Sequence, residues 1–272
     1  MNSQLSAAAI QMTSSSELAA NLEKAARLIA KAAEQGAKLV VLPENFALMG
    51  RTERDKLSIM EPPGQGPIQD FLASAADQFD LWLVGGSIPL RSQDPTKAYA
   101  ACLIYGPGGT LKGRYDKIHL FDVNLPGTDE SYRESHTIAA GDCPLLLATP
   151  FGKLGVAICY DIRFPEFIRA LSAQGLEILA VPAAFTARTG AAHWEVLLRA
   201  RAIENQCFVI AAAQTGTHES GRQTYGHSMI IDPWGNVLAR LGREEGVCLA
   251  TLDLNALGQI RRDFPVLTHR RF

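Results

Sequence analysis

The sequence has no long apolar run and no basic cluster, and each absence argues against a class of protein. No uninterrupted apolar stretch approaches the ~20 residues that a membrane-spanning helix needs. The first four residues lack the basic and then apolar pattern that opens a signal peptide. The formal net charge is −2, and no run of lysine or arginine favours a nucleic acid or an anionic membrane surface. We therefore expect neither nucleic acid nor a membrane as a partner.

Cysteine is scarce, and its spacing does not follow a known metal or redox pattern. The five cysteines are odd in number and widely scattered, and no C-x-x-C pair occurs. This spacing argues against a zinc site of the usual kind and against a redox motif. Four of the five lie in apolar runs, where a reduced and buried thiol is the usual state. These features predict a cytoplasmic protein.

Linkers and internal repeats are also missing. No Pro/Ser-rich segment or shift in composition divides the chain, and no motif recurs at a fixed period. Helix-like segments link the early strand-like runs, and hairpin signals such as GPGG at residues 106–109 separate later ones. Residues 81–88 predict one strand, residues 121–142 a long polar loop, and residues 193–206 a helix. With about a dozen strands and four main helices, this pattern predicts one α/β domain over residues 1–272. Two stacked sheets covered by helices are its natural packing.

The most informative segment ends in a cysteine. Residues 153–159 form an apolar, strand-like run that stops at Cys159, and the charged, helix-like sequence YDIR follows at 160–163. A strand, a sharp turn and a helix would place the thiol at a helix N-terminus, whose partial positive charge favours thiolate. Alternatively, Cys159 merely fills a buried strand, as free cysteines often do.

Charged side chains follow two other strand-like runs. Glu44 follows the run at residues 38–43, and Lys117 follows the run at 110–115. Because α/β folds gather ligand and catalytic groups at strand ends, we expect these residues and Cys159 to converge on one pocket. Taken singly, Glu44 and Lys117 are also compatible with solvated surface charges.

The three side chains form a complete set for acyl transfer. A thiolate attacks a carbonyl carbon, a carboxylate accepts the thiol proton, and an ammonium stabilises the developing oxyanion. For Glu44 to act as a base near neutral pH, we expect partial burial to raise its pKa.

Five motifs give the chain a resemblance to the nitrilase superfamily of carbon–nitrogen hydrolases over nearly its whole length. They are LPEN (42–45), YDKIHLFD (115–122), GVAICYDIRFPE (155–166), YGHS (225–228) and DPWG (232–235). The resemblance implies a four-layer α-β-β-α sandwich. It also implies a homodimer that pairs through helices beside the active-site sheet.

The resemblance assigns roles to individual residues. It implies that Glu44 is the general base, Lys117 the oxyanion stabiliser and Cys159 the nucleophile. The backbone N–H of Tyr160 completes the oxyanion hole. Glu134, in the matching motif YRES (132–135), orients the lysine and the attacking group. The implied reaction needs no metal and no organic cofactor.

Residues 189–207, together with 117–123 and 160–166, are similar to the Nit branch of the superfamily. Within that branch, the choice of substrate rests on the similarity of AAAQ (211–214), His218 and YGHSM (225–229). This similarity implies a small-molecule substrate that is an amide of an α-keto acid. The first expectation is hydrolysis of deaminated glutathione to α-ketoglutarate and cysteinylglycine through a cysteine thioester. The alternative is ω-amidase activity on α-ketoglutaramate, or another small amide of the superfamily. The first two substrates load the same α-ketoglutaryl group and differ in the leaving group.

Carboxylates on such a substrate need cationic partners, and arginine binds two oxygens at once. Arg163 and Arg188 are the candidates, although structural ion pairs would explain either equally well. Thr186 and His193, in the loop expected after the strand at 177–181, are further candidates for lining the pocket.

Other classes fit the sequence less well. A papain-like Cys–His hydrolase has histidines available, but the motifs around a papain-type cysteine are absent. A nucleotide-binding enzyme would need a Gly-rich motif after a strand, whereas GQG at 64–66 lies in a Pro-rich turn. A non-enzymatic scaffold would be favoured by loss of a triad residue, and all three are present. A nitrile substrate is possible in the superfamily, but the Nit-branch segments favour an amide.

Overall fold

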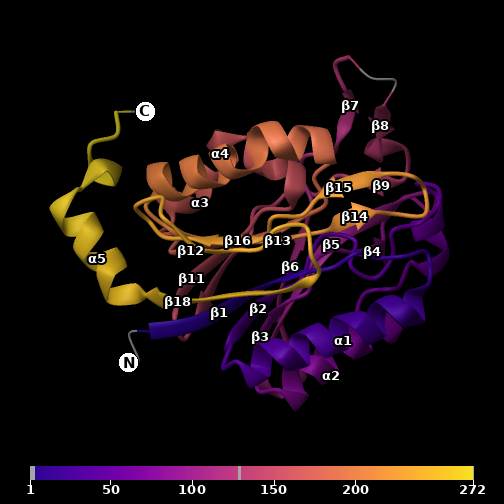
Figure 1. Ribbon diagram of the computed structural model, residues 1–272, viewed down its shortest axis with the longest axis horizontal. Helices are drawn as coiled ribbons and strands as arrows, with labels where there is room; N and C mark the ends of the chain where they lie inside the picture. Colours follow the sequence, from indigo (N-terminus) through magenta and orange to yellow (C-terminus); the bar gives the residue numbers. More distant parts are fainter. Residues whose placement is uncertain (1–3, 128–129, 272) are drawn as a thin grey trace.

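Two β-sheets lie face to face, and helices cover their outer faces. The computed structural model describes residues 4–127 and 130–271. Figure 1 shows α1 and α2 below the sheets and α3 and α4 above them, in four layers. The predicted α-β-β-α sandwich is therefore confirmed. Residues 1–3, 272 and part of the predicted loop at 121–142 lie outside the described residues.

Each sheet mixes parallel and antiparallel strands. The first sheet has the order β18 (Gly246–Asp253), β1 (Gln4–Gln11), β2 (Leu39–Val41), β3 (Trp82–Val84), β5 (Ala98–Gly106) and β4 (Ile88–Arg91), and β6 (Thr110–Asp116) and β9 (Ile138–Ala139) also pair with β5. The second has the order β10 (Leu146–Thr149), β11 (Gly152–Val156), β12 (Ile178–Ala183), β13 (Phe208–Ala213), β16 (Met229–Ile231) and β17 (Val237–Arg240). Two short hairpins, β7 (Asp122–Asn124) with β8 (Ser131–Arg133) and β14 (Thr215–Thr217) with β15 (Gln223–Tyr225), lie outside the sheets.

The helices bury one face each. They are α1 (Leu18–Glu34), α2 (Pro67–Gln78), α3 (Pro165–Ala173), α4 (Ala187–Asn205) and α5 (Leu254–Asp263). In α1, for example, Ala25, Ile29 and Ala32 are buried, at the three- and four-residue spacing of a helix face. No helix in the described part of the chain is both long and apolar enough to cross a bilayer.

Alternating residues of the central strands supply two apolar cores. In β1, Ala7 and Ala9 face the core between the sheets, whereas Ala8 and Ile10 face the core under the helices. Both faces of the strand are buried, so it reads as a continuous apolar run. This burial holds the strands rigidly. Their ends therefore give fixed positions to the residues that follow.

The sequence placed some elements wrongly. The predicted strand at 81–88 is two strands, β3 and β4, which pair with successive parts of the same edge of β5, while β6 pairs with the other edge. The strand is interrupted between them at Gly86, whose φ of +60° suits glycine. The segment at 121–142, predicted as a loop, contains the β7–β8 hairpin, a 3₁₀ turn at Glu134–His136 and β9. Its strands are short and polar, so they lack the apolar alternation that marks a strand.

Two helix predictions also need correction. The helix predicted at 193–206 begins at Ala187, because the Thr186 side chain caps it by accepting a hydrogen bond from the Thr189 N–H. Arg188 and His193 are therefore helical and do not lie in a loop. Helix α5 was not predicted, although the Asp253 carboxylate caps it by accepting from two backbone N–H groups.

We expect Gly86→Ala to destabilise the protein and to disturb the segment that carries Glu44. A Cβ there would lie 2.2 Å from the carbonyl oxygen of Pro43. The positive φ and the overpacking together should cost about 2–4 kcal/mol of unfolding free energy. Denaturant unfolding and the catalytic rate check both effects.

Gly108→Ala is the matched control. Its φ is +74°, but nothing lies within 4 Å of the added Cβ. It should cost only the backbone term of about 1–2 kcal/mol and leave activity unchanged. Equal losses of stability and activity in the two variants would contradict this account.

Candidate active site

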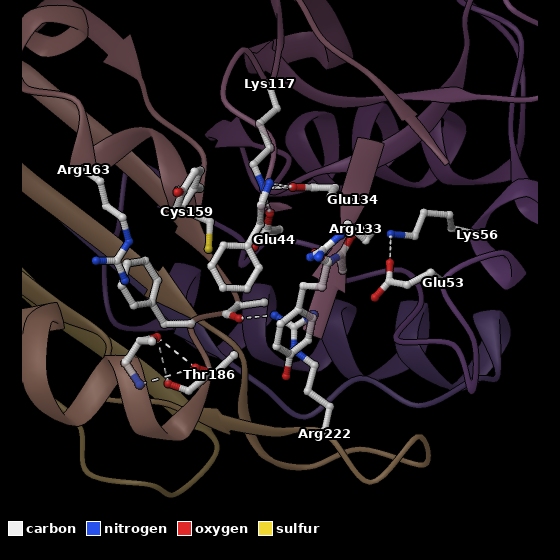
Figure 2. Close-up of a pocket in the computed structure, with 17 residues that line it drawn as sticks. Glu44, Glu53, Lys56, Lys117, Arg133, Glu134, Cys159, Arg163, Thr186 and Arg222 are labelled. Carbon is white, nitrogen blue, oxygen red and sulfur yellow. Dashed lines mark hydrogen bonds and ion pairs between the residues drawn. The ribbon is translucent and has the colours of Figure 1, made fainter. Parts of the chain in front are cut away.

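A buried lysine between two carboxylates forms the centre of the site. Lys117 Nζ lies 2.7 Å from Glu44 Oε1, and 3.0 and 2.9 Å from the two oxygens of Glu134. Lys117 is 1% exposed and Glu44 3%. Glu44 follows β2 and Lys117 follows β6 in the first sheet, whereas Cys159 follows β11 in the second. All four side chains line one pocket, so the predicted convergence of the three strand ends is confirmed (Figure 2).

The charges of this cluster stabilise one another. Burial lowers the pKa of Lys117, but Glu134 and Glu44 outweigh burial and hold it well above the usual value of 10.5. For Glu44, burial acts in the opposite direction and raises the pKa. The charge of Lys117 and hydrogen bonding with Lys117 and the Cys159 thiol outweigh this effect, so the pKa of Glu44 lies below 4.5. The lysine is therefore protonated and Glu44 ionised near neutral pH.

Two electrostatic expectations from the sequence are wrong. The pKa of Glu44 is lowered rather than raised, because its ion pair with Lys117 outweighs burial. Cys159 is not poised as a thiolate, since burial and the negative charge of Glu44 raise its pKa well above 9.0. Lys117 and a hydrogen bond from the Ala184 backbone oppose this shift without reversing it. At rest, the site holds a neutral thiol beside an ionised carboxylate.

Cys159 occupies a strained turn and not the strand itself. Strand β11 ends at Val156, and Cys159 opens a 3₁₀ helix at Cys159–Arg163 with a φ of +50°. Left-handed backbone is unfavourable for a residue with a Cβ, and it places the side chain where a regular strand would not. The N–H of Tyr160 makes no hydrogen bond within the described residues, as expected in the first turn of a helix. It is therefore available to an acceptor in the pocket.

One buried carboxylate ties this turn to the lysine segment. Asp161 accepts hydrogen bonds from Tyr115 Oη at 2.7 Å and from the backbone N–H groups of His119 and Ile158 at 3.0 and 2.8 Å. Its Oδ1 also lies 2.7 Å from His119 Nδ1. Tyr115 and His119 flank Lys117 in the sequence. Asp161 thus fixes Lys117 and the thiol-bearing turn relative to each other.

Only some of the predicted substrate-contact residues line the pocket that holds Cys159. Arg163 and Thr186 line the inner pocket beside Cys159, whereas Arg188 lines only the wider cleft outside it. His193 is absent from the walls of both, and its Nδ1 lies 3.2 Å from Arg163 Nη1. Figure 2 shows Arg163 beside Cys159, at the side of the pocket away from Glu134.

Sequence reasoning missed several polar residues of the pocket wall. They are Glu53, Lys56, Tyr132, Arg133 and Arg222. Glu53 and Lys56 form an ion pair at 2.7 Å, and the Arg222 guanidinium lies over the Tyr132 ring, 5.1 Å from its centroid. Only Tyr132 and Arg133 stood in a quoted motif. The other three come from segments far from every strand end that the sequence singled out.

The described residues contain no group of three or more His, Cys, Asp or Glu side chains placed to hold a metal ion. The reactive groups of the site are a thiol, a carboxylate base and an ammonium. These groups suit cleavage of a carbonyl–nitrogen bond by acyl transfer.

Comparison with known proteins identifies the family. The family model described as carbon–nitrogen hydrolase matches residues 6–262. The chain therefore belongs to the carbon–nitrogen hydrolase family of the nitrilase superfamily, whose enzymes use a Glu–Lys–Cys catalytic triad.

Individual relatives agree with this assignment. Deaminated glutathione amidase of Synechocystis is 48% identical over 269 residues, which are 98% of this chain and 98% of that protein. The omega-amidase of Xenopus tropicalis is 41% identical over 251 residues, covering 92% of this chain and 89% of that protein. The structure of Saccharomyces cerevisiae Nit3, a member of branch 10 of the nitrilase superfamily, has a TM-score of 0.89 at 33% identity and covers 99% of this chain and 97% of Nit3.

The charge states predict a broad pH profile. A base must be ionised, and because the pKa of Glu44 is lowered, protonation should inactivate it only below pH 4.5. The thiol keeps its proton up to well above pH 9.0. We expect kcat/KM to stay level between these limits, with circular dichroism at each pH as the control for folding. If the pKa of Glu44 were raised, kcat/KM would instead fall on the acid side at about pH 6–7, and this result would contradict the lowered pKa.

Proposed function

We propose that the protein hydrolyses deaminated glutathione to α-ketoglutarate and cysteinylglycine, with Cys159 as nucleophile, Glu44 as general base and Lys117 as oxyanion stabiliser. The observation that carries the proposal is the Glu44–Lys117–Glu134 ion-pair cluster beside the Cys159 thiol in one pocket. The 48% identity to a deaminated glutathione amidase over 98% of both chains supports the choice of substrate. No metal and no organic cofactor takes part in the proposed cycle.

The first half of the cycle acylates the enzyme. Glu44 accepts the thiol proton as the Cys159 sulfur attacks the amide carbon, so that the S–C bond forms from a neutral thiol. Lys117 and the Tyr160 N–H donate to the developing oxyanion. Glu44 then passes its proton to the nitrogen as the C–N bond breaks, and cysteinylglycine leaves. Glu134 positions Lys117 through its two short contacts.

The second half restores the enzyme. Glu44 takes a proton from water as the water oxygen attacks the thioester carbon. The tetrahedral intermediate collapses, the C–S bond breaks and the sulfur regains its proton from Glu44. Because one carboxylate serves both halves, it must return to its ionised state after each. The ion pair with Lys117 provides for that return by holding the pKa of Glu44 low.

The alternative function is ω-amidase activity on α-ketoglutaramate. The 41% identity to an omega-amidase favours keeping it, because the same acyl group would reach Cys159. Ammonia would then leave in place of cysteinylglycine.

Steady-state kinetics on three substrates test the proposal. We expect kcat/KM to be highest for deaminated glutathione, lower for α-ketoglutaramate and undetectable for a simple nitrile. Cys159→Ala should abolish turnover of all three without changing the circular dichroism spectrum. If deaminated glutathione and α-ketoglutaramate were both inert, the substrate class would be wrong. If Cys159→Ala kept its activity, the thioester mechanism would be wrong.

We also propose that residues 1–272 form one catalytic domain in a cytoplasmic homodimer. The shared apolar core of the two sheets supports a single domain, and five free cysteines suit a reducing compartment. On the outer face of α4, the apolar residues Val196 and Ile203 are 69% and 47% exposed. Between small residues such as Ala192 and Ala200, they line a shallow cleft that a second copy of α4 would cover.

The dimer predicts that Val196→Asp yields monomers. Size-exclusion chromatography with light scattering should give twice the chain mass for the unmodified protein and the chain mass for the variant. Leu111→Asp, at a 47% exposed leucine on β6, is the control and should stay dimeric. If the unmodified protein had the mass of a monomer at micromolar concentration, the proposed dimer would be refuted.

A further inference from the structure

None of the three arginines of the pocket wall has a carboxylate partner within the described residues. Arg133 is exposed, and it donates to the carbonyls of Val123 and Tyr132 and to Asn124 Oδ1. The Arg163 guanidinium lies over the rings of Phe185 and Tyr160, 5.0 and 5.8 Å from their centroids. The Arg222 guanidinium lies over the Tyr132 ring, and its Nη2 donates to the Ala184 carbonyl at 2.7 Å. Neither forms an ion pair, although both line the pocket that holds Cys159.

Arg222 also has an incomplete set of hydrogen bonds. Its Nε is buried and has no partner in the described structure. A buried donor without an acceptor destabilises the fold, so such a group calls for an explanation. Stacking on Tyr132 and the bond to Ala184 hold the guanidinium in place without satisfying this donor. An anionic ligand would supply the missing acceptors.

Arg163 and Arg222 occupy different parts of the hollow. The inner pocket adjoins an outer cleft, and the two share wall residues such as Asn45 and Lys56. Arg163 lines only the inner pocket, whereas Arg222 and Tyr132 line both. Figure 2 shows Arg163 and Arg222 on different sides of Cys159. A substrate whose scissile carbon lies at the sulfur would therefore meet one arginine on each side.

The two candidate substrates differ on one side only. Both carry the carboxylate of the α-ketoglutaryl group, but only deaminated glutathione carries a second carboxylate, at the end of its leaving group. The leaving group must depart through the open cleft. Its two residues span at most about 7 Å when extended, which carries the terminal carboxylate from the inner pocket toward the junction with the cleft.

We propose that Arg222 binds the terminal carboxylate of the leaving group and thereby makes the enzyme specific for an N-substituted amide that ends in an anion. This inference rests on the proposed function and refines it. Arg163 then serves the acyl half that both substrates share. An active site for α-ketoglutaramate alone would need no unpaired cation at the mouth of the pocket, because ammonia leaves no anionic group there.

Other cations near the cleft are less suited to this role. Arg51 is paired with Glu219 at 2.9 Å, and its side chain is 72% exposed. Arg188 lines only the outer cleft, is exposed and donates to the Gly127 carbonyl. An exposed charge binds an anion weakly, because water and salt screen it. Arg222 is partly buried, and its stacking fixes the orientation of its fork.

The test compares Arg222→Gln with the unmodified enzyme on two substrates. We expect kcat/KM for deaminated glutathione to fall roughly 10- to 100-fold, the range that loss of a charge-assisted hydrogen bond gives. Turnover of α-ketoglutaramate should change by less than about threefold, which also shows that the variant is folded. Loss of the Arg222 charge also affects Glu44, but this effect is the same for both substrates and cancels in the ratio of their kcat/KM values.

A modified substrate isolates the contact itself. Deaminated glutathione that ends in glycinamide lacks the terminal carboxylate, so the unmodified enzyme should process it roughly 10- to 100-fold less efficiently than the parent compound. Arg222→Gln should not distinguish the two compounds. Arg222→Lys, which keeps the charge without the fork, should give an intermediate ratio. Arg91→Gln removes an exposed arginine elsewhere and is the control for net charge.

Three outcomes would overturn the inference while leaving the proposed function intact. They are an equal fall in kcat/KM for both substrates in Arg222→Gln, a failure of the unmodified enzyme to distinguish the terminal acid from the terminal amide, and loss of that discrimination in Arg188→Gln alone. An unmodified enzyme that turns over α-ketoglutaramate but not deaminated glutathione would instead refute the proposed function.

Discussion

The buried ion pairs of Lys117 determine the rest of the site. An ammonium removed from water is strongly destabilising unless carboxylates surround it, and here Glu44 and Glu134 do so at 2.7 to 3.0 Å. Each carboxylate depends on the lysine in the same way, because two buried negative charges alone would repel one another. The three groups come from the end of β2, the end of β6 and the segment after β8. The sandwich must therefore hold these segments in register.

This arrangement determines how the thiol is activated. A thiolate beside Glu44 would add a further negative charge to the pocket, so the neutral thiol is favoured at rest. The thiolate is the nucleophilic form of cysteine, so it must arise as Glu44 takes the proton. The left-handed turn at Cys159 and the four contacts of Asp161 then determine where the sulfur meets the carbonyl carbon. Charge and geometry thus act together at one strand end.

The sequence predicted the catalytic residues that lie at strand ends. It did not predict the pKa directions or the pocket-wall residues that depend on long-range contacts. Cys159 ends a strand-like run, and Glu44 and Lys117 each follow one, which is a local signal, and their convergence follows from the rule for strand ends. The pKa directions of Glu44 and Cys159 were wrong, because burial and ion pairing oppose each other and only the geometry shows which effect is larger. Arg222 was missed because the β14–β15 hairpin brings it to the pocket from more than 60 residues beyond Cys159 in the sequence. The sequence predicted helix α4 to begin at residue 193, although it begins at Ala187. Gly190, an unfavourable residue for a helix interior, interrupts the helical pattern in the turn that follows the Thr186 cap.

The central claim is that Cys159 carries the acyl group of the substrate as a thioester during turnover. Acid quenching during turnover, followed by intact-mass and peptide mass spectrometry, tests it most directly. The account predicts one α-ketoglutaryl group on the peptide that contains Cys159, with the same added mass from deaminated glutathione and from α-ketoglutaramate. Turnover with no adduct, an adduct on another residue, or different added masses from the two substrates would contradict it.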